Sequence, residues 1–169
     1  MLALRIEPAR ERDATRMARM SRRLIEHGLA WRWTPQALLA QIRDPDTIVI
    51  VARDPETDPS IVGFAVMQYR FEREVAHLVL LAVDRAARRR GLGRSLVAWL
   101  EKVARTGGIC EITVEVRADN DGARRFYRAL GYAEGARVRK YYDGRLDAIR
   151  LSARLGRRRP PAGTTLPGT

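Results

Sequence analysis

The sequence of 169 residues contains one cysteine, Cys110, and no long apolar run. A single cysteine forms no internal disulfide and no cysteine-based zinc site, so we expect a reducing, cytoplasmic location and no metal. No apolar stretch approaches the roughly 18 residues that a membrane-spanning helix needs. The first ten residues, MLALRIEPAR, become charged at the fifth and lack the apolar core of a secretion signal. These absences predict a protein that neither enters a membrane nor is exported.

Enough apolar material is present to build one core. Hydrophobic residues make up 46% of the chain, and the apolar runs at 48–52 and 78–83 exclude a disordered protein. The length suits one domain, and no internal repeat is visible. We therefore expect one domain over residues 1–155. The remaining residues, 156–169, form a basic, Pro- and Gly-rich segment that we expect to be a disordered tail.

Positive charge dominates, with a formal net charge of +12. The arginines gather in two places, at residues 85–94 and in the tail at 154–159. Such clusters suit a nucleic acid, an acidic substrate or a polyanionic cofactor, although a basic run is also the usual form of a solvated face. No aromatic RNA-binding signature or helix-turn-helix pattern accompanies these arginines. A nucleic-acid-binding module without catalysis is therefore the weaker alternative.

The order of apolar segments predicts a mixed α/β fold. Strands are expected at 2–6, 48–53, 61–69, 74–83 and 109–117, and helices at 17–28, 35–42, 92–107 and 121–130. Asp143-Gly144 predicts a two-residue turn between two final strands. Residues 78–83 are apolar on both faces, which indicates a central strand covered on both sides. The expected fold class is α/β (mixed α+β), one domain with a central mixed sheet flanked by helices.

A glycine-containing loop between a strand and a helix is the most informative motif. Its sequence is Arg88-Arg89-Arg90-Gly91-Leu92-Gly93. Two glycines allow a ligand to approach the backbone, and the free N–H groups of the first helical turn attract an anion. A Walker loop would need Lys where Arg94 stands, and a dinucleotide fingerprint would need glycine where Leu96 stands. The loop therefore predicts a phosphate-binding site of another kind.

This loop resembles the acyl-CoA pyrophosphate loop of the GNAT N-acetyltransferase superfamily, in which Arg88, Gly91 and Gly93 occupy the fixed positions. A second motif, Asn120-x-x-Ala123-x-x-Phe126-Tyr127-x-x-x-Gly131-Tyr132, is similar to another signature of that family. The resemblance extends over residues 48–155. It implies a GNAT-like domain that uses acetyl-CoA. The residues that it assigns to acetyl-CoA are Leu81, Ala82, Val83, Arg88, Arg89, Arg90, Gly91, Leu92, Gly93, Arg94, Ser95, Asn120 and Tyr127.

Two further segments resemble one branch of the family. Residues 115–120 (EVRADN) and 141–148 (YYDGRLDA) are similar to ribosomal-protein alanine acetyltransferases and related protein N-terminal acetyltransferases. The resemblance implies that Glu115 is the base and that Tyr127 protonates the leaving thiolate. It also implies that Tyr141 and Tyr142 line a peptide groove. Residues 30–35 fall in the acceptor region of the family, so Trp31 and Trp33 are candidates for contact with the amine acceptor or for core packing.

Several alternatives stay open at this point. Glu72, Glu74 or His77, on the preceding strand, could act as the base in place of Glu115. The amine acceptor could be a protein N-terminal α-amine or a small molecule such as a polyamine, a drug or a metabolite. The protein could be a monomer or a homodimer. The tail arginines could be merely solvated or could contact RNA or the ribosome.

Overall fold

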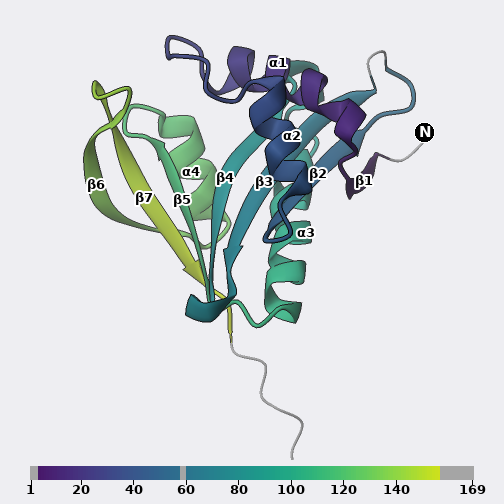
Figure 1. Ribbon diagram of the computed structural model, residues 1–169. Helices are drawn as coiled ribbons and strands as arrows, with labels where there is room; N and C mark the ends of the chain where they lie inside the picture. The colour runs from purple at the N-terminus through teal and green to yellow at the C-terminus, as the bar shows by residue number, and fades with distance from the viewer. Residues whose placement is uncertain (1–3, 58–59, 157–169) are drawn as a thin grey trace, which may run out of the picture.

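The computed structural model describes residues 4–57 and 60–156, and in these residues seven strands form one sheet (Figure 1). The strand order is β1-β2-β3-β4-β5-β7-β6. The strands are β1 (Arg5–Pro8), β2 (Thr47–Arg53), β3 (Ile61–Arg70), β4 (Val75–Val83), β5 (Glu111–Arg117), β6 (Ala133–Tyr142) and β7 (Leu146–Arg154). The helices are α1 (Ala14–Leu24), α2 (Pro35–Arg43), α3 (Leu92–Thr106) and α4 (Asp121–Ala129), with short 3-10 helices η1 (Glu11–Asp13), η2 (Phe71–Arg73) and η3 (Arg85–Ala87).

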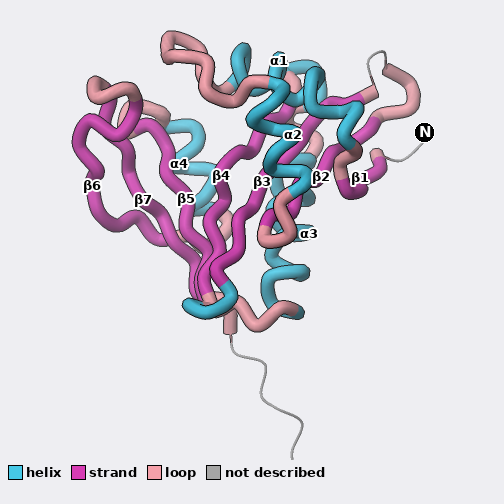
Figure 2. The backbone as a smooth tube through the Cα atoms, in the orientation of Figure 1, coloured by secondary structure: helices cyan, strands magenta, loops and turns pink. Residues whose placement is uncertain are grey.

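Strands β4 and β5 are neighbours for only part of their length (Figure 2). They pair in parallel from Val75 with Glu111 to Leu78 with Val114, whereas the other neighbouring strands are antiparallel. In the described residues no pairing of these two strands continues past Leu78. The C-terminal half of β4 therefore pairs with a neighbouring strand on one edge only, toward β3.

A bulge in β4 marks the point at which the two strands part. Met67 on β3 pairs with Leu78, and the next residue, Val66, pairs with Leu80, so Val79 is one residue more than β3 can match. The bulge also changes the face of the sheet on which alternate side chains of β4 lie. Leu78 packs in the cluster on one face of the sheet, and Leu80 packs in the cluster on the other face.

Helices cover both faces of the sheet. Helices α1 and α2 lie on one face, where Met17, Met20 and Leu38 are fully buried against Phe64. Helices α3 and α4 lie on the opposite face and contribute Leu96, Leu100 and Tyr127 to the larger cluster. The sheet is therefore the middle of three layers, and the predicted fold class is confirmed.

Several local predictions are also confirmed. The Thr34 hydroxyl accepts a hydrogen bond from the N–H of Ala37 at 3.2 Å and caps α2, which begins at Pro35. In the final turn, Asp143 and Gly144 have φ values of 50° and 64°, and the N–H of Arg145 donates to the carbonyl of Tyr142 at 2.9 Å.

Some boundaries differ from those that the sequence predicts. Helix α1 ends at Leu24 rather than near Gly28, because residues 25–34 form a folded loop held by its own Glu26 and by Arg117 of β5. The first strand begins at Arg5, and residues 1–3 of the predicted strand lie outside the described residues. The same is true of residues 157–169 of the predicted tail. No helix in the described part of the chain is long and apolar enough to cross a membrane.

Candidate active site

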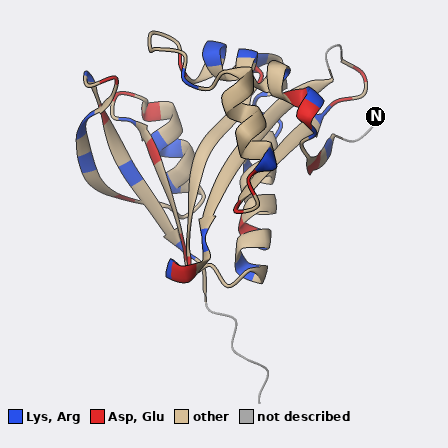
Figure 3. Cartoon of the chain, in the orientation of Figure 1, with Lys and Arg blue, Asp and Glu red and all other residues tan. Residues whose placement is uncertain are grey.

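A cleft with a volume of about 1020 Å³ lies where β4 and β5 separate. Its walls come from the C-terminal halves of both strands and from the beginnings of α3 and α4. The loop between α1 and α2, residues 25–34, and the tip of the β6–β7 hairpin line one end. Figure 3 shows Lys and Arg on α1 and along β6 and β7. The cleft brings together polar groups from distant parts of the chain.

The loop before α3 forms a cradle of backbone N–H groups in this cleft. Gly91 adopts a left-handed φ of 73° directly before the helix, and the first bond within the helix runs from the N–H of Ser95 to the Gly91 carbonyl at 3.0 Å. The N–H groups of Leu92, Gly93 and Arg94 therefore have no acceptor within the helix. All three residues line the cleft, so the helix N-terminus offers it free N–H groups and a partial positive charge.

Next to this cradle, β4 offers free backbone groups. The N–H of Asp84 donates to Val62 of β3 at 2.8 Å. Because successive N–H groups of a strand point to opposite edges, those of Leu81 and Val83 point toward the cleft, on the edge without a partner strand. The Val83 carbonyl accepts a hydrogen bond from Arg88 Nε at 3.1 Å. An extended polar ligand could thus bind along this edge as an additional strand would.

Not every residue assigned to acetyl-CoA by the family resemblance lines the cleft. Leu81, Val83, Arg88, Arg89, Gly91, Leu92, Gly93, Arg94, Asn120 and Tyr127 do. Ala82 is buried toward α1 and α2, and Arg90 Nη1 lies 3.5 Å from an Asp54 carboxylate oxygen. The Ser95 hydroxyl donates to the Gly91 carbonyl at 3.1 Å. Ser95 therefore stabilises the loop conformation through this hydrogen bond and does not line the cleft.

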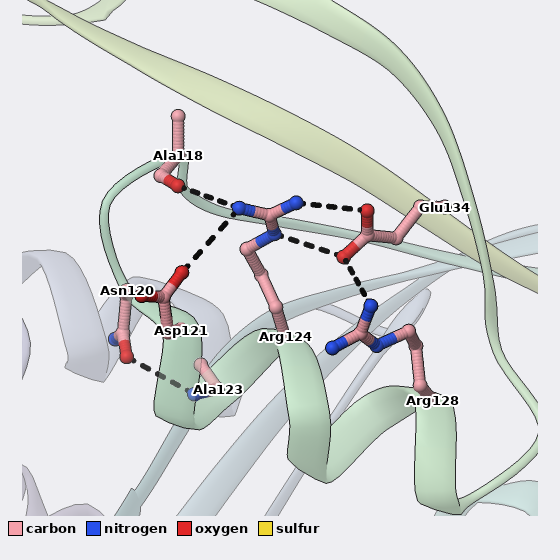
Figure 4. Close-up of polar contacts among 7 residues, drawn as sticks. All are labelled: Ala118, Asn120, Asp121, Ala123, Arg124, Arg128 and Glu134. Atoms are coloured by element: carbon pink, nitrogen blue, oxygen red, sulfur yellow. Dashed lines mark hydrogen bonds and ion pairs between the residues drawn. The ribbon is translucent and has the colours of Figure 1, made fainter.

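The start of α4 is fixed by hydrogen bonds that leave part of Asn120 available (Figure 4). Asn120 Oδ1 accepts from the N–H of Ala123 at 3.0 Å and caps the helix. Arg124 donates to both carboxylate oxygens of Glu134 at 2.8 and 3.0 Å and to the Ala118 carbonyl at 3.1 Å. The turn between β5 and α4 is thereby tied to β6. Because Oδ1 is used by the cap, the amide N–H groups of Asn120 are what this side chain can offer to a ligand.

Glu115 lies in the wall of the cleft with its side chain 5% exposed. Arg150 Nε donates to Oε1 at 2.7 Å, and His77 Nε2 lies 2.9 Å from Oε2. Burial opposes ionisation, but the contacts with His77 and Arg150 outweigh it and hold the pKa of this carboxyl below its usual value. Glu115 is therefore a carboxylate at neutral pH and can accept or attract a proton.

The lowered pKa makes Glu115 a contributor to stability that depends on pH. An unfolded glutamate titrates near 4.5, and folding lowers that value, so the contribution is full above pH 4.5 and is lost as the pH falls through the lower folded pKa. We expect Glu115→Gln to lower the free energy of unfolding by about 1–2 kcal/mol at pH 7. This difference should shrink below pH 4. Urea unfolding of both proteins at the two pH values measures it, and an equal difference at both would contradict the ionic role.

Tyr127 points into the cleft from α4 and is almost completely buried. Burial raises the pKa of its hydroxyl far above the ordinary value, with a smaller contribution from Tyr142. The ring contacts Phe126 and Tyr132 edge-on, at centroid distances of 5.0 and 5.4 Å. These contacts hold the ring in one position. The hydroxyl remains protonated through the neutral range and can act as a proton donor.

The predicted acceptor residues divide into two groups. Trp33, Tyr141 and Tyr142 line the cleft, and the Tyr142 hydroxyl donates to the Glu115 carbonyl at 3.2 Å. Trp31 does not line it. Its ring packs with the α1 and α2 cluster, and the guanidinium of Arg22 lies 4.9 Å from the ring centroid.

Of the three alternative bases, one lines the cleft and two do not. His77 lines the cleft beside Glu115, and its Nδ1 lies 3.0 Å from the Thr113 hydroxyl. Glu72 belongs to η2, and Glu74 precedes β4, so neither is on the strand where the sequence placed it. They lie at the end of the sheet where β4 and β5 are still paired, and neither lines the cleft. Of these three residues, only His77 can take part in chemistry there.

Several residues of the cleft were not singled out in the sequence. Glu26, Arg32, Arg117, Asp143 and Arg150 line it or contact its central carboxylate. Arg117 and Arg150 have positions on β5 and β7 that period-two alternation could have placed beside Glu115. The others depend on the path of irregular loops, for which the sequence carries no periodic signal. Among the described residues, no group of three or more His, Cys, Asp or Glu could hold a metal ion.

Comparisons with known proteins agree with this geometry. The sequence model of the acetyltransferase (GNAT) family matches residues 10–132. The ribosomal protein bS18-alanine N-acetyltransferase of Escherichia coli K12 is 38% identical over 92 residues, which are 53% of this chain and 61% of that enzyme. The N-alpha-acetyltransferase RimI of Mycobacterium tuberculosis is 36% identical over 115 residues, which are 65% of this chain and 67% of that protein. The match thus spans less than two thirds of the E. coli relative.

Solved structures show the same fold over almost the whole chain. The crystal structure of the E. coli ribosomal-protein-S18-alanine N-acetyltransferase has a TM-score of 0.77 and 25% identity, covering 98% of this chain and all of that one. Ard1 from Thermoplasma volcanium has a TM-score of 0.78 and 26% identity, covering 91% of this chain and 99% of that one. The resemblance found in the sequence is confirmed: this chain belongs to the GNAT family of acetyltransferases.

Proposed function

We propose that this protein transfers the acetyl group of acetyl-CoA to the α-amine at the N-terminus of a protein. One observation carries the proposal. The N-terminal N–H groups of α3, the free edge of β4, Glu115 and Tyr127 all line one cleft. The first two suit a diphosphate joined to an extended polar arm, and the last two suit proton transfer to and from the reacting atoms.

The cleft residues fit acetyl-CoA in the order in which its parts are joined. The cradle formed by Leu92, Gly93 and Arg94 would hold the diphosphate, and the N–H groups of Leu81 and Val83 would bind the amide-containing arm. Bound in this way, acetyl-CoA supplies a thioester as the acetyl donor. A β4 backbone N–H at the free edge would stabilise the negative charge that develops on the thioester oxygen.

The acceptor amine must lose a proton because an ammonium ion has no lone pair for attack. Glu115 is ionised and can take that proton directly or through a water molecule. Its low pKa makes it a weak base, so its larger effect is to attract the ammonium and to orient the amine. His77, 2.9 Å from Glu115, is the second group that could receive the proton. Tyr127, held protonated by burial, would donate a proton to the departing thiolate.

The choice of a protein N-terminus rests on the relatives. The name of the E. coli protein describes acetylation of an alanine of ribosomal protein bS18. The name of the M. tuberculosis protein describes acetylation of an α-amine. The acceptor end of the cleft in this chain is lined by Trp33, Tyr141 and Tyr142. The first residues of an extended chain terminus could pack against these aromatic side chains. A small amine would also fit and is the alternative outcome of the test.

Two measurements test the proposal. First, acetyl-CoA at 100 times its Kd should stabilise the protein by about 2.7 kcal/mol, which corresponds to a rise in Tm of roughly 5–10 °C. Second, CoA release should be faster with an alanine-initiated peptide than with the same peptide blocked at its N-terminus and carrying an internal lysine, or with spermidine. No rise in Tm would contradict acetyl-CoA binding. A preference for spermidine would assign the small-amine function instead.

A further inference from the structure

The α1–α2 loop, residues 25–34, connects the two sides of the cleft. It leaves α1, which packs against β4, and reaches the tip of the β6–β7 hairpin (Figure 1). Asp143 on that hairpin accepts a hydrogen bond from the N–H of Ala30 at 2.8 Å and lies 3.2 Å from Arg32 Nη2. Arg145 donates to the Gly28 carbonyl at 3.2 Å. The loop therefore forms the wall of the cleft at the acceptor end.

Glu26 makes this loop one connected unit. The residue is 6% exposed, and its carboxylate accepts three hydrogen bonds. They come from the Ser21 hydroxyl at 2.9 Å and from the backbone N–H groups of Arg32 at 2.7 Å and Trp33 at 3.0 Å. A displacement of the loop at residue 26 would therefore carry Trp33, a residue of the cleft wall, along with it.

Arg117 holds the loop on both sides of Glu26. Its Nη2 donates to the carbonyl of Ile25 at 2.9 Å and to that of His27 at 2.7 Å. In the described residues Arg117 forms no ion pair with a carboxylate, so these two carbonyls are the partners that the structure gives it. Arg117 lies on β5 two residues after Glu115, on the same face of the strand. One side chain thus ties the acceptor wall to the strand that carries the proposed base.

We propose that Arg117 is a positioning residue for the acceptor. It fixes the distance between the wall that contains Trp33 and the carboxylate of Glu115, and so sets the affinity for the acceptor without contacting acetyl-CoA. This inference rests on the proposed function for the identity of the reaction. A cationic donor forms stronger hydrogen bonds than a neutral one, and a guanidinium can serve two acceptors that a single ammonium group reaches less well.

The test compares Arg117→Gln and Arg117→Lys with Arg139→Gln, which removes an exposed charge from β6 outside the cleft wall. For an alanine-initiated hexapeptide, Arg117→Gln should raise the KM about tenfold, because two charge-assisted hydrogen bonds are lost. Its KM for acetyl-CoA and its kcat should stay within about twofold. Arg117→Lys should recover part of the loss, and Arg139→Gln should resemble the wild type.

A second measurement does not depend on activity. Amide hydrogen exchange at Arg32 and Trp33 should accelerate in Arg117→Gln and not in Arg139→Gln, because the loop is released. Unchanged exchange, or faster exchange with an unchanged peptide KM, would overturn the inference. An equal rise in the KM for the peptide and the KM for acetyl-CoA, together with a lower Tm, would also overturn the inference. Arg117 would then have only a general structural role. Failure of the wild type to acetylate the peptide contradicts the proposed function alone, and the exchange comparison still decides whether Arg117 holds the loop.

Discussion

A Gly91→Val variant should bind CoA on the order of 10- to 100-fold more weakly than the wild type and still fold. Gly91 has a φ of 73°, and a Cβ at this position would meet no atom within 4 Å. The side chain itself would therefore fit the folded protein, but a β-branched residue disfavours the left-handed backbone by about 1–2 kcal/mol. The loop would relax toward negative φ, and the N–H groups of Leu92 and Gly93 would turn away from the diphosphate. Calorimetric titration with CoA measures the effect.

The chain offers a matched control at the other end of the same helix. Gly108 has a φ of 80° and open space where a Cβ would lie, and it does not line the cleft. Gly108→Val should incur a similar backbone cost and lower the Tm comparably, while leaving CoA affinity unchanged. Undiminished CoA affinity in a folded Gly91→Val variant would remove the loop from the binding site.

The second large effect is expected from Tyr127→Phe, which keeps the buried ring and removes the hydroxyl. CoA affinity should hold, because the contacts with Phe126 and Tyr132 involve the ring. If Tyr127 protonates the thiolate, kcat should fall by about 10²- to 10⁴-fold. Single-turnover measurements are needed, because slow product release would hide a change in the chemical step.

Tyr132→Phe is the appropriate control for this variant. Tyr132 is as deeply buried, and its hydroxyl donates to Glu101 at 3.2 Å, but it does not line the cleft. Its loss should lower stability and leave the single-turnover rate near that of the wild type. Equal rates for Tyr127→Phe and the wild type would mean that Tyr127 serves only as a packing residue.

Local signals in the sequence were sufficient for much of the fold. Thr34-Pro35 predicts the start of α2 because a hydroxyl cap and a fixed proline φ both favour a helix start there. On β5, the alternation of Ile112, Val114 and Val116 with polar residues predicts which face is buried, and the structure has the same alternation. Such predictions succeed because the determinant lies within a few residues of the feature.

The bulge at Val79 shows what the sequence does not reveal. Ala76, Leu78, Leu80 and Ala82 occupy alternate positions and read as one face of a strand, yet the first two pack against α3 and α4 and the last two against α1 and α2. The whole segment is apolar, so no polar residue marks the reversal. The sequence also does not reveal that Trp31 and Trp33 have different surroundings. Their loop is held by Glu26, Arg117 and Asp143, which come from three parts of the chain.

The short parallel pairing of β4 and β5 has a consequence for how the molecule assembles. Strands β2, β3 and β4 follow one another as antiparallel neighbours, so their pairing closes short loops. Joining β5 to β4 requires the chain to cross over through α3, from Val83 to Glu111. The two strands then pair at four positions only. Closing a long connection costs conformational entropy before its contacts form. The cleft therefore lies at a junction that closes only through a long crossover, between the antiparallel meander β2–β3–β4 and the C-terminal strands β5, β6 and β7.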